Sequence, residues 1–168
     1  MKHRIEQKPA FEAIGYSFRT TTVGGENMRE VPKFWDRCLA DGKVAGLGPM
    51  SGSWGILGLC ADFDAKMEKF TYMIGVEAAP GGLKAREGIS SLKLPAATYA
   101  VFSCVGAMPD AIQAGWQTIM GEWLPQSDYV EASPINFELY PSFPDGDPRG
   151  DPTSPQCYTE IWIPIKQK

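Results

Sequence analysis

The sequence predicts an α+β fold in which tandem βαββ repeats form one antiparallel sheet. The same order of patterns, strand, helix, strand and strand, occurs twice along the 168 residues. Each half carries a single helical stripe, and one helix cannot cover both faces of its part of the sheet. We therefore expect a sheet of about six strands with two helices on one face. A ligand groove between the repeats is expected on the other face.

The first repeat is expected over residues 1–82 and begins with an extended pattern over residues 3–20. A helix is predicted over residues 26–41, because apolar residues recur there at helical spacing. Its stripe consists of Val31, Phe34, Trp35, Cys38 and Leu39. Strands are predicted over residues 54–60 and 69–77. The first of these two is apolar on both faces, which is typical of a central strand.

The second repeat is expected over residues 83–168 and has the same order. A strand is predicted over residues 94–105 and a helix over residues 109–123. The helical stripe consists of Ile112, Trp116, Ile119, Met120 and Trp123. A strand over residues 135–140 and a loop rich in Pro, Gly and Asp over residues 141–155 follow. The halves also share a Pro-Ala pair near their first strand, Pro9-Ala10 and Pro95-Ala96, which supports an internal repeat.

The closing segment, residues 157–165, alternates strictly. Its isoleucines at 161, 163 and 165 fall on one face, and Tyr158, Glu160 and Trp162 on the other. A carboxylate covered by aromatic rings is costly unless a positive or hydrogen-bonding group meets it. Glu160 is therefore either a structural carboxylate paired within the fold or a group that waits for a ligand.

The predicted register places further side chains in the groove. Leu57, Leu59, Phe137 and Leu139 are expected to face the helices. Tyr72 falls on the same side in this register, but a slip of one residue would turn it to the other face. The residues expected to bind a ligand in the groove are Glu160, Tyr140, Trp123, Tyr158, Trp162, Trp54 and Glu138. Trp35 and Trp116 lie on the helical stripes and are assigned to the core.

The composition limits the partners and the location. The net charge is −4, the isoelectric point is near 5.0, and Lys and Arg form no cluster, so direct binding of nucleic acid is disfavoured. A weakly acidic surface tolerates cationic small molecules. No apolar run could span a membrane, and the N-terminus lacks the apolar core of a signal peptide. Four widely spaced cysteines indicate reduced thiols, and we expect a cytoplasmic protein.

His3 is the only histidine, and its position near the terminus argues against several kinds of chemistry. Ser-His-Asp and Cys-His nucleophilic catalysis and His-ligated metal sites are disfavoured. No metal and no cofactor is expected. Any catalysis would have to rest on carboxylates, Tyr, Lys or Cys.

Six motifs in a fixed order resemble the GyrI-like family, the effector-binding domain that is also fused to AraC- and MerR-type regulators. They are VPKFW at 31–35, GLCADFD at 58–64, FTYMIGVE at 70–77, EWLPQSDY at 122–129, FELYP at 137–141 and EIWIP at 160–164. The resemblance covers nearly the whole chain. It implies the SHS2 tandem-repeat fold in a stand-alone single domain, with a cleft that takes up planar, lipophilic and often cationic drugs and dyes.

The resemblance also implies roles for individual residues. The glutamate of the final strand, which matches Glu160, supplies the negative charge at the cleft floor. Some stand-alone relatives look like hydrolases that open the cyclopropane of DNA-alkylating natural products with a buried glutamate. The regulators carry a DNA-binding domain, for which this chain has no residues left over.

Three functions remain open from the sequence. The first is a module that binds lipophilic or cationic small molecules through Glu160 and the aromatic side chains. The second is a hydrolase in which Glu160 is the catalytic base and Tyr140 or Tyr158 stabilises an oxyanion. The third is a groove for a protein partner, and a homodimer is possible in each case.

Overall fold

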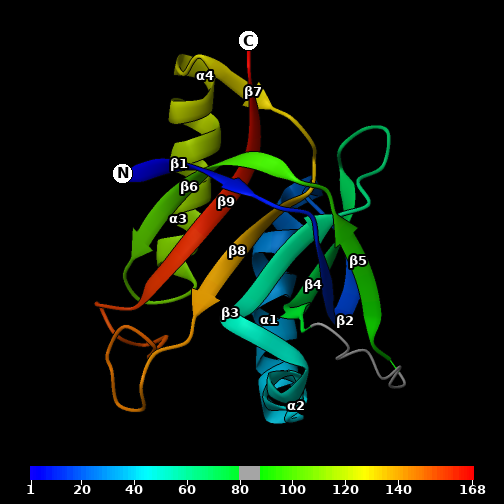
Figure 1. Ribbon diagram of the computed structural model, residues 1–168, viewed down its shortest axis with the longest axis vertical. Coiled ribbons are helices and arrows are strands. Elements are labelled where there is room, and N and C mark those ends of the chain that lie inside the picture. The colour runs from blue at the N-terminus through cyan, green and yellow to red at the C-terminus, as the bar shows by residue number, and fades with distance from the viewer. Residues whose placement is uncertain (80–87) are drawn as a thin grey trace.

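The computed structural model describes residues 1–79 and 88–168, with only the backbone of Ser53, and confirms the expected α+β class. Nine antiparallel strands join in one sheet across these residues. Figure 1 shows the sheet from the side away from α1, which passes behind β3 and β4. The sequence predicted about six strands, because β1 and β2 were read as a single strand and the short strands β5 and β7 were missed.

The first half contains four strands. Its elements are β1 (His3–Lys8), β2 (Phe11–Thr21), η1 (Val23–Gly25), α1 (Glu26–Ala40), α2 (Lys43–Leu47), η2 (Gly48–Met50), β3 (Ser51–Ala61) and β4 (Lys69–Ala78). The predicted helix is α1. The extended pattern over residues 3–20 is two strands, because Pro9 and Ala10 interrupt it.

The second half contains five strands. Its elements are β5 (Ser90–Leu94), β6 (Ala97–Val105), α3 (Asp110–Thr118), η3 (Ile119–Trp123), α4 (Leu124–Gln126), β7 (Tyr129–Glu131), β8 (Asn136–Pro141) and β9 (Tyr158–Gln167). The predicted helix over residues 109–123 is α3 continued by the single π-helical turn η3. The short strand β7 was not predicted. The expected repeat boundary at residues 82 and 83 lies outside the described residues.

The strand order shows that the halves exchange their first strands. The order is β1-β6-β9-β8-β3-β4-β2-β5, and β7 pairs with β9 outside this path. The halves meet where β3 pairs with β8. The first strand of the first half, β1, pairs with β6, and the first strand of the second half, β5, pairs with β2.

The sheet curls because its two ends are tied together. Only two residues connect β1 to β2, and only two connect β5 to β6, although each pair lies at opposite ends of the strand order. Such a link spans about 11 Å at most. The curled sheet encloses a large apolar core of Ala13, Leu57, Leu59, Met73, Leu94, Tyr99, Val101, Phe137, Leu139 and Trp162.

The helices cover the outer face of the curl. On α1, Phe34 and Cys38 pack against Tyr72 and Ile74, and on α3 Ile112 packs in a cluster with the buried isoleucines of β9. The sequence left the face of Tyr72 open, and the structure places it on the side of the helices. Two stripe members, Leu39 and Met120, are exposed instead.

The prediction of which side chains of β3 and β8 face the helices was wrong. Leu57, Leu59, Phe137 and Leu139 lie inside the curl, away from the helices. Their neighbours Glu138 and Tyr140 therefore face the helices. Alternation of side chains could not decide this point, because both faces of the curled sheet are buried.

Among the helices in residues 1–79 and 88–168, none has the length and apolar character that crossing a membrane requires.

Candidate functional site

Glu138 lies on the central strand β8 under the two helices, and only 6% of its surface is exposed. Trp116 of α3 donates from Nε1 to Oε1 of this glutamate at 2.7 Å. The hydroxyls of Tyr72 and Tyr140 both donate to Oε2 at 2.9 Å. Trp35 of α1 donates from Nε1 to the Tyr72 hydroxyl at 2.9 Å. Both helices and both halves of the chain thus converge on one carboxylate.

Gly58 provides the space for this network. It pairs directly with Glu138 across β3 and β8. A Cβ atom at this position would lie 2.3 Å from the Tyr72 hydroxyl oxygen and 2.7 Å from Glu138 Oε2. Only glycine leaves room there for the Tyr72 side chain to reach the carboxylate.

The carboxylate of Glu138 has no cationic partner among the residues that the structure describes. Burial raises the pKa of Glu138 above its usual value, and the hydrogen bonds from Trp116, Tyr140 and Tyr72 offset this only in part. Burial also raises the pKa of Tyr72 and of Tyr140 well above 10.0, so both hydroxyls stay neutral donors. The site therefore holds a buried acid surrounded by neutral donors.

Aromatic rings cover this acid. The rings of Trp35 and Tyr140 pack with centroids 4.8 Å apart, and both side chains are partly exposed. Oε1 of Glu138 accepts one hydrogen bond, from Trp116, and so retains an acceptor position. A molecule that reaches the carboxylate must displace part of this cover, and a cation with apolar surface is the chemistry that such a site favours.

Glu160 lies on the opposite face of the sheet, inside the curl. Arg4 of β1 donates to Oε1 at 2.8 Å and to Oε2 at 3.1 Å, and its guanidinium lies 5.4 Å from the Trp162 ring centroid. Tyr158 donates at 2.7 Å and Trp162 at 2.9 Å. Burial acts to raise the pKa of Glu160, but Arg4 and these donors hold it below 4.5. These contacts favour the structural interpretation of Glu160.

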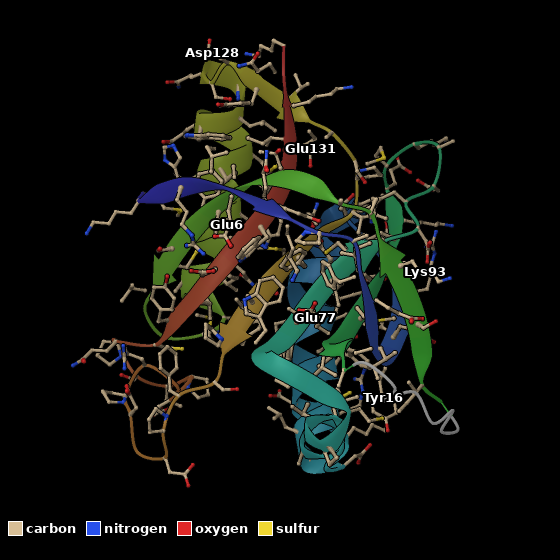
Figure 2. All side chains as sticks on the ribbon, in the orientation of Figure 1. Glu6, Tyr16, Glu77, Lys93, Asp128 and Glu131 are labelled. Atoms are coloured by element: carbon tan, nitrogen blue, oxygen red, sulfur yellow. The ribbon has the colours of Figure 1, made fainter. Side chains whose placement is uncertain are left out.

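The remaining candidates do not join Glu138. Trp54 packs against Trp162 inside the curl, at 4.9 Å between ring centroids, and the ammonium of Lys8 lies 3.7 Å from its ring centroid. Lys8 also forms a 3.1 Å ion pair with Glu77, which is labelled in Figure 2. Trp123, at the end of η3, packs against Phe102 and borders a separate cavity of about 280 Å³.

The predicted groove residues thus fall into three places. Glu138 and Tyr140 lie under the helices, the group of Tyr158, Glu160, Trp162 and Trp54 lies inside the curl, and Trp123 lies at the end of η3. Sequence reasoning missed Trp35 and Trp116, which were assigned to the core. A signal was present, because a buried indole N–H needs an acceptor, and both repeats carry a tryptophan on the helical stripe.

The antiparallel sheet with α1 and α3 on its outer face is the fold of an effector-binding domain. Residues 4–165 match the family described as "Cass2: Integron-associated effector binding protein". The chain belongs to this family, and the resemblance to GyrI-like effector-binding domains is confirmed.

Individual relatives agree with this assignment. The chain is 28% identical over 166 residues to the transcriptional regulator BrlR of Pseudomonas aeruginosa, a match that covers 98% of the chain and 56% of BrlR. The chain therefore spans about half the length of that regulator. The structure of SAV2435 bound to tetraphenylphosphonium superimposes with a TM-score of 0.81 at 27% identity, over 99% of this chain and 94% of SAV2435.

Similarity to a third solved structure supports the fold and nothing further. The integron cassette protein VCH_CASS2 from the mobile metagenome of Vibrio cholerae has a TM-score of 0.69 at 17% identity. The superposition covers 98% of this chain and 95% of that protein.

Proposed function

We propose that this protein binds lipophilic cations between α1 and α3, with Glu138 as the charge that attracts them. The observation that carries this proposal is the carboxylate itself, which is buried and has no cationic partner among the described residues. It accepts hydrogen bonds only from the neutral donors Trp116, Tyr72 and Tyr140, and Trp35 of α1 reaches it through the Tyr72 hydroxyl. Glu138 takes the role that the family resemblance assigned to Glu160, because the acid at 160 already binds Arg4.

The relative SAV2435 supports the ligand class. Its solved structure is bound to tetraphenylphosphonium, a delocalised cation that carries no N–H or O–H donor. Such an ion can interact with Glu138 only through charge, and with Trp35 and Tyr140 only through their rings. A cation over an aromatic face contributes about 0.5–2 kcal/mol. Together with the buried charge, affinity in the micromolar range, about 8 kcal/mol, is expected.

Titration calorimetry with tetraphenylphosphonium tests the proposal. A unit charge about 5 Å from the carboxylate gains about 3 kcal/mol at an effective dielectric constant of about 20. Glu138→Gln keeps the shape of the site and removes the charge, so the affinity should fall about 100-fold. The affinity for the neutral analogue triphenylphosphine oxide should change little in the same variant.

Glu160→Gln is the matched control, since it removes the other buried acid and should leave the affinity of the folded protein unchanged. The proposal is overturned if Glu138→Gln binds tetraphenylphosphonium as well as the native protein does. It is equally overturned if Glu160→Gln alone abolishes binding.

One observation favours a second function at the same place. The raised pKa of Glu138 suits a general base that activates water, and the neutral hydroxyls of Tyr72 and Tyr140 could stabilise an oxyanion. Incubation with a cyclopropane-containing electrophile followed by mass spectrometry tests this alternative, and recovery of the intact compound after long incubation refutes it.

The proposed setting is the cytoplasm, without direct contact to nucleic acid. The net charge of −4 and the absence of disulfides among the described cysteines support this setting.

A further inference from the structure

Asn136 has a buried polar atom that no described residue satisfies. The residue is 7% exposed, and its Oδ1 atom has no hydrogen-bond partner within residues 1–79 and 88–168. The amide nitrogen makes one contact, a long one of 3.5 Å to the carbonyl of Pro134. A buried polar group without a partner costs stability, so this amide calls for an explanation.

The register places Asn136 beside the candidate ligand site. Residues 136, 138 and 140 of β8 project to the same face, because side chains alternate along a strand. Asn136 pairs with Cys60 of β3, two positions along the strands from the pair formed by Gly58 and Glu138. The two side chains therefore leave the strand about 7 Å apart. The unsatisfied oxygen therefore belongs to a side chain on the same face of β8 as Glu138, two residues away along the strand.

We propose that the site is built for cations that also donate hydrogen bonds, namely protonated lipophilic amines, and that Asn136 is the residue that selects them. This inference rests on the proposed function of Glu138. An ammonium group donates one N–H to Oε1 of Glu138 and directs a second toward Oδ1 of Asn136. A quaternary ion satisfies the charge of the site and leaves the Asn136 oxygen without a donor.

A matched pair of ions tests the selection. Benzhydrylammonium and its N,N,N-trimethyl counterpart carry the same charge and the same two rings, and they differ in N–H donors. The quantity measured is the ratio of their dissociation constants, the trimethyl ion over the ammonium ion, by titration calorimetry at neutral pH.

Asn136→Leu removes the acceptor while it keeps the size of the side chain. The ratio should fall about fivefold, the usual worth of one hydrogen bond, whereas the dissociation constant of the trimethyl ion should hardly change. Thr20→Val is the control. Thr20 is 4% exposed, its hydroxyl also has no partner, and it lies on β2, separated from β8 by β4 and β3. This variant should leave the ratio unchanged.

The outcomes separate the two proposals. An unchanged ratio in Asn136→Leu, with binding of the trimethyl ion still dependent on Glu138, overturns this inference alone and assigns the Asn136 oxygen to a bound water. Failure of both ions to bind the native protein overturns the proposed function as well. If Asn136→Leu does not fold, Asn136→Val carries the same measurement.

Discussion

Gly58→Ala should break the network around Glu138 although the substitution adds only one methyl group. The new Cβ would lie 2.3 Å from the Tyr72 hydroxyl oxygen, so the tyrosine must move. Movement breaks the bond from Trp35 and the bond to Glu138, each worth about 1–2 kcal/mol. Crowding in the core adds about 1–3 kcal/mol. Together these terms give a fall in the free energy of unfolding of about 3–7 kcal/mol.

The second substitution of a double-mutant cycle isolates the cause. Tyr72→Phe removes the atom that the new methyl group meets first, at the cost of one donor to Glu138. If the hydroxyl is the obstacle, Gly58→Ala should cost much less in the Tyr72→Phe background. The double variant should be about 2 kcal/mol more stable than the sum of the single changes implies.

Urea denaturation followed by tryptophan fluorescence gives these free energies. Gly46→Ala is the matched control, because Gly46 lies inside α2 and its Cβ would meet no atom within 4 Å. It should stabilise the protein by about 0.5–1 kcal/mol. Simple additivity of Gly58→Ala and Tyr72→Phe would refute the steric reasoning, and so would equal effects of Gly58→Ala and Gly46→Ala.

Two further predictions concern the charges. Burial raises the pKa of Glu138 above 4.5, so the folded protein binds more protons than the unfolded chain between 4.5 and the raised value. As pH rises through this window, the free energy of unfolding should fall and the affinity for tetraphenylphosphonium should rise. Urea denaturation at several pH values measures the first trend, and calorimetry measures the second. Both trends should be absent in Glu138→Gln. Arg4→Met should cost about 2 kcal/mol in urea denaturation, because it leaves Glu160 buried without its cation, with a discount for an arginine side chain that is 45% exposed. Glu6→Gln removes the exposed partner of the same arginine, labelled in Figure 2, and should cost less than 0.5 kcal/mol; equal effects of the two variants would contradict this account.

The sequence was a good guide to the elements and a poor guide to the faces of the sheet. The alternation of residues 157–165 correctly separated the isoleucines from Glu160 and Trp162, because the isoleucines meet α3. The same reasoning failed for Phe137 and Leu139, since it assumed that the apolar side of β8 meets the helices. A sheet that curls on itself needs apolar side chains on its inner face as well. The alternation of residues along one strand does not show that the sheet curls.

The sequence could have indicated the acid of the candidate site through the buried hydrogen-bond donors that need an acceptor, rather than through the neighbours of each carboxylate. Glu160 was favoured because its strand neighbours are aromatic, but its partner Arg4 lies 156 positions away and pairs through a strand exchange that no local pattern reveals. Trp35 and Trp116 each carry an indole N–H that burial obliges to find an acceptor. Both lead to Glu138, directly or through Tyr72.

The exchange of β1 and β5 between the halves limits how a ligand can enter. The halves meet along β3 and β8, and α1 and α3 lie on either side of that seam. Moving the two halves apart as units would also detach β1 from β6 and β5 from β2, which would cost two complete strand pairings. We therefore expect a ligand at the proposed site to be accommodated by rotation of side chains such as Trp35 and Tyr140, while the backbone stays closed.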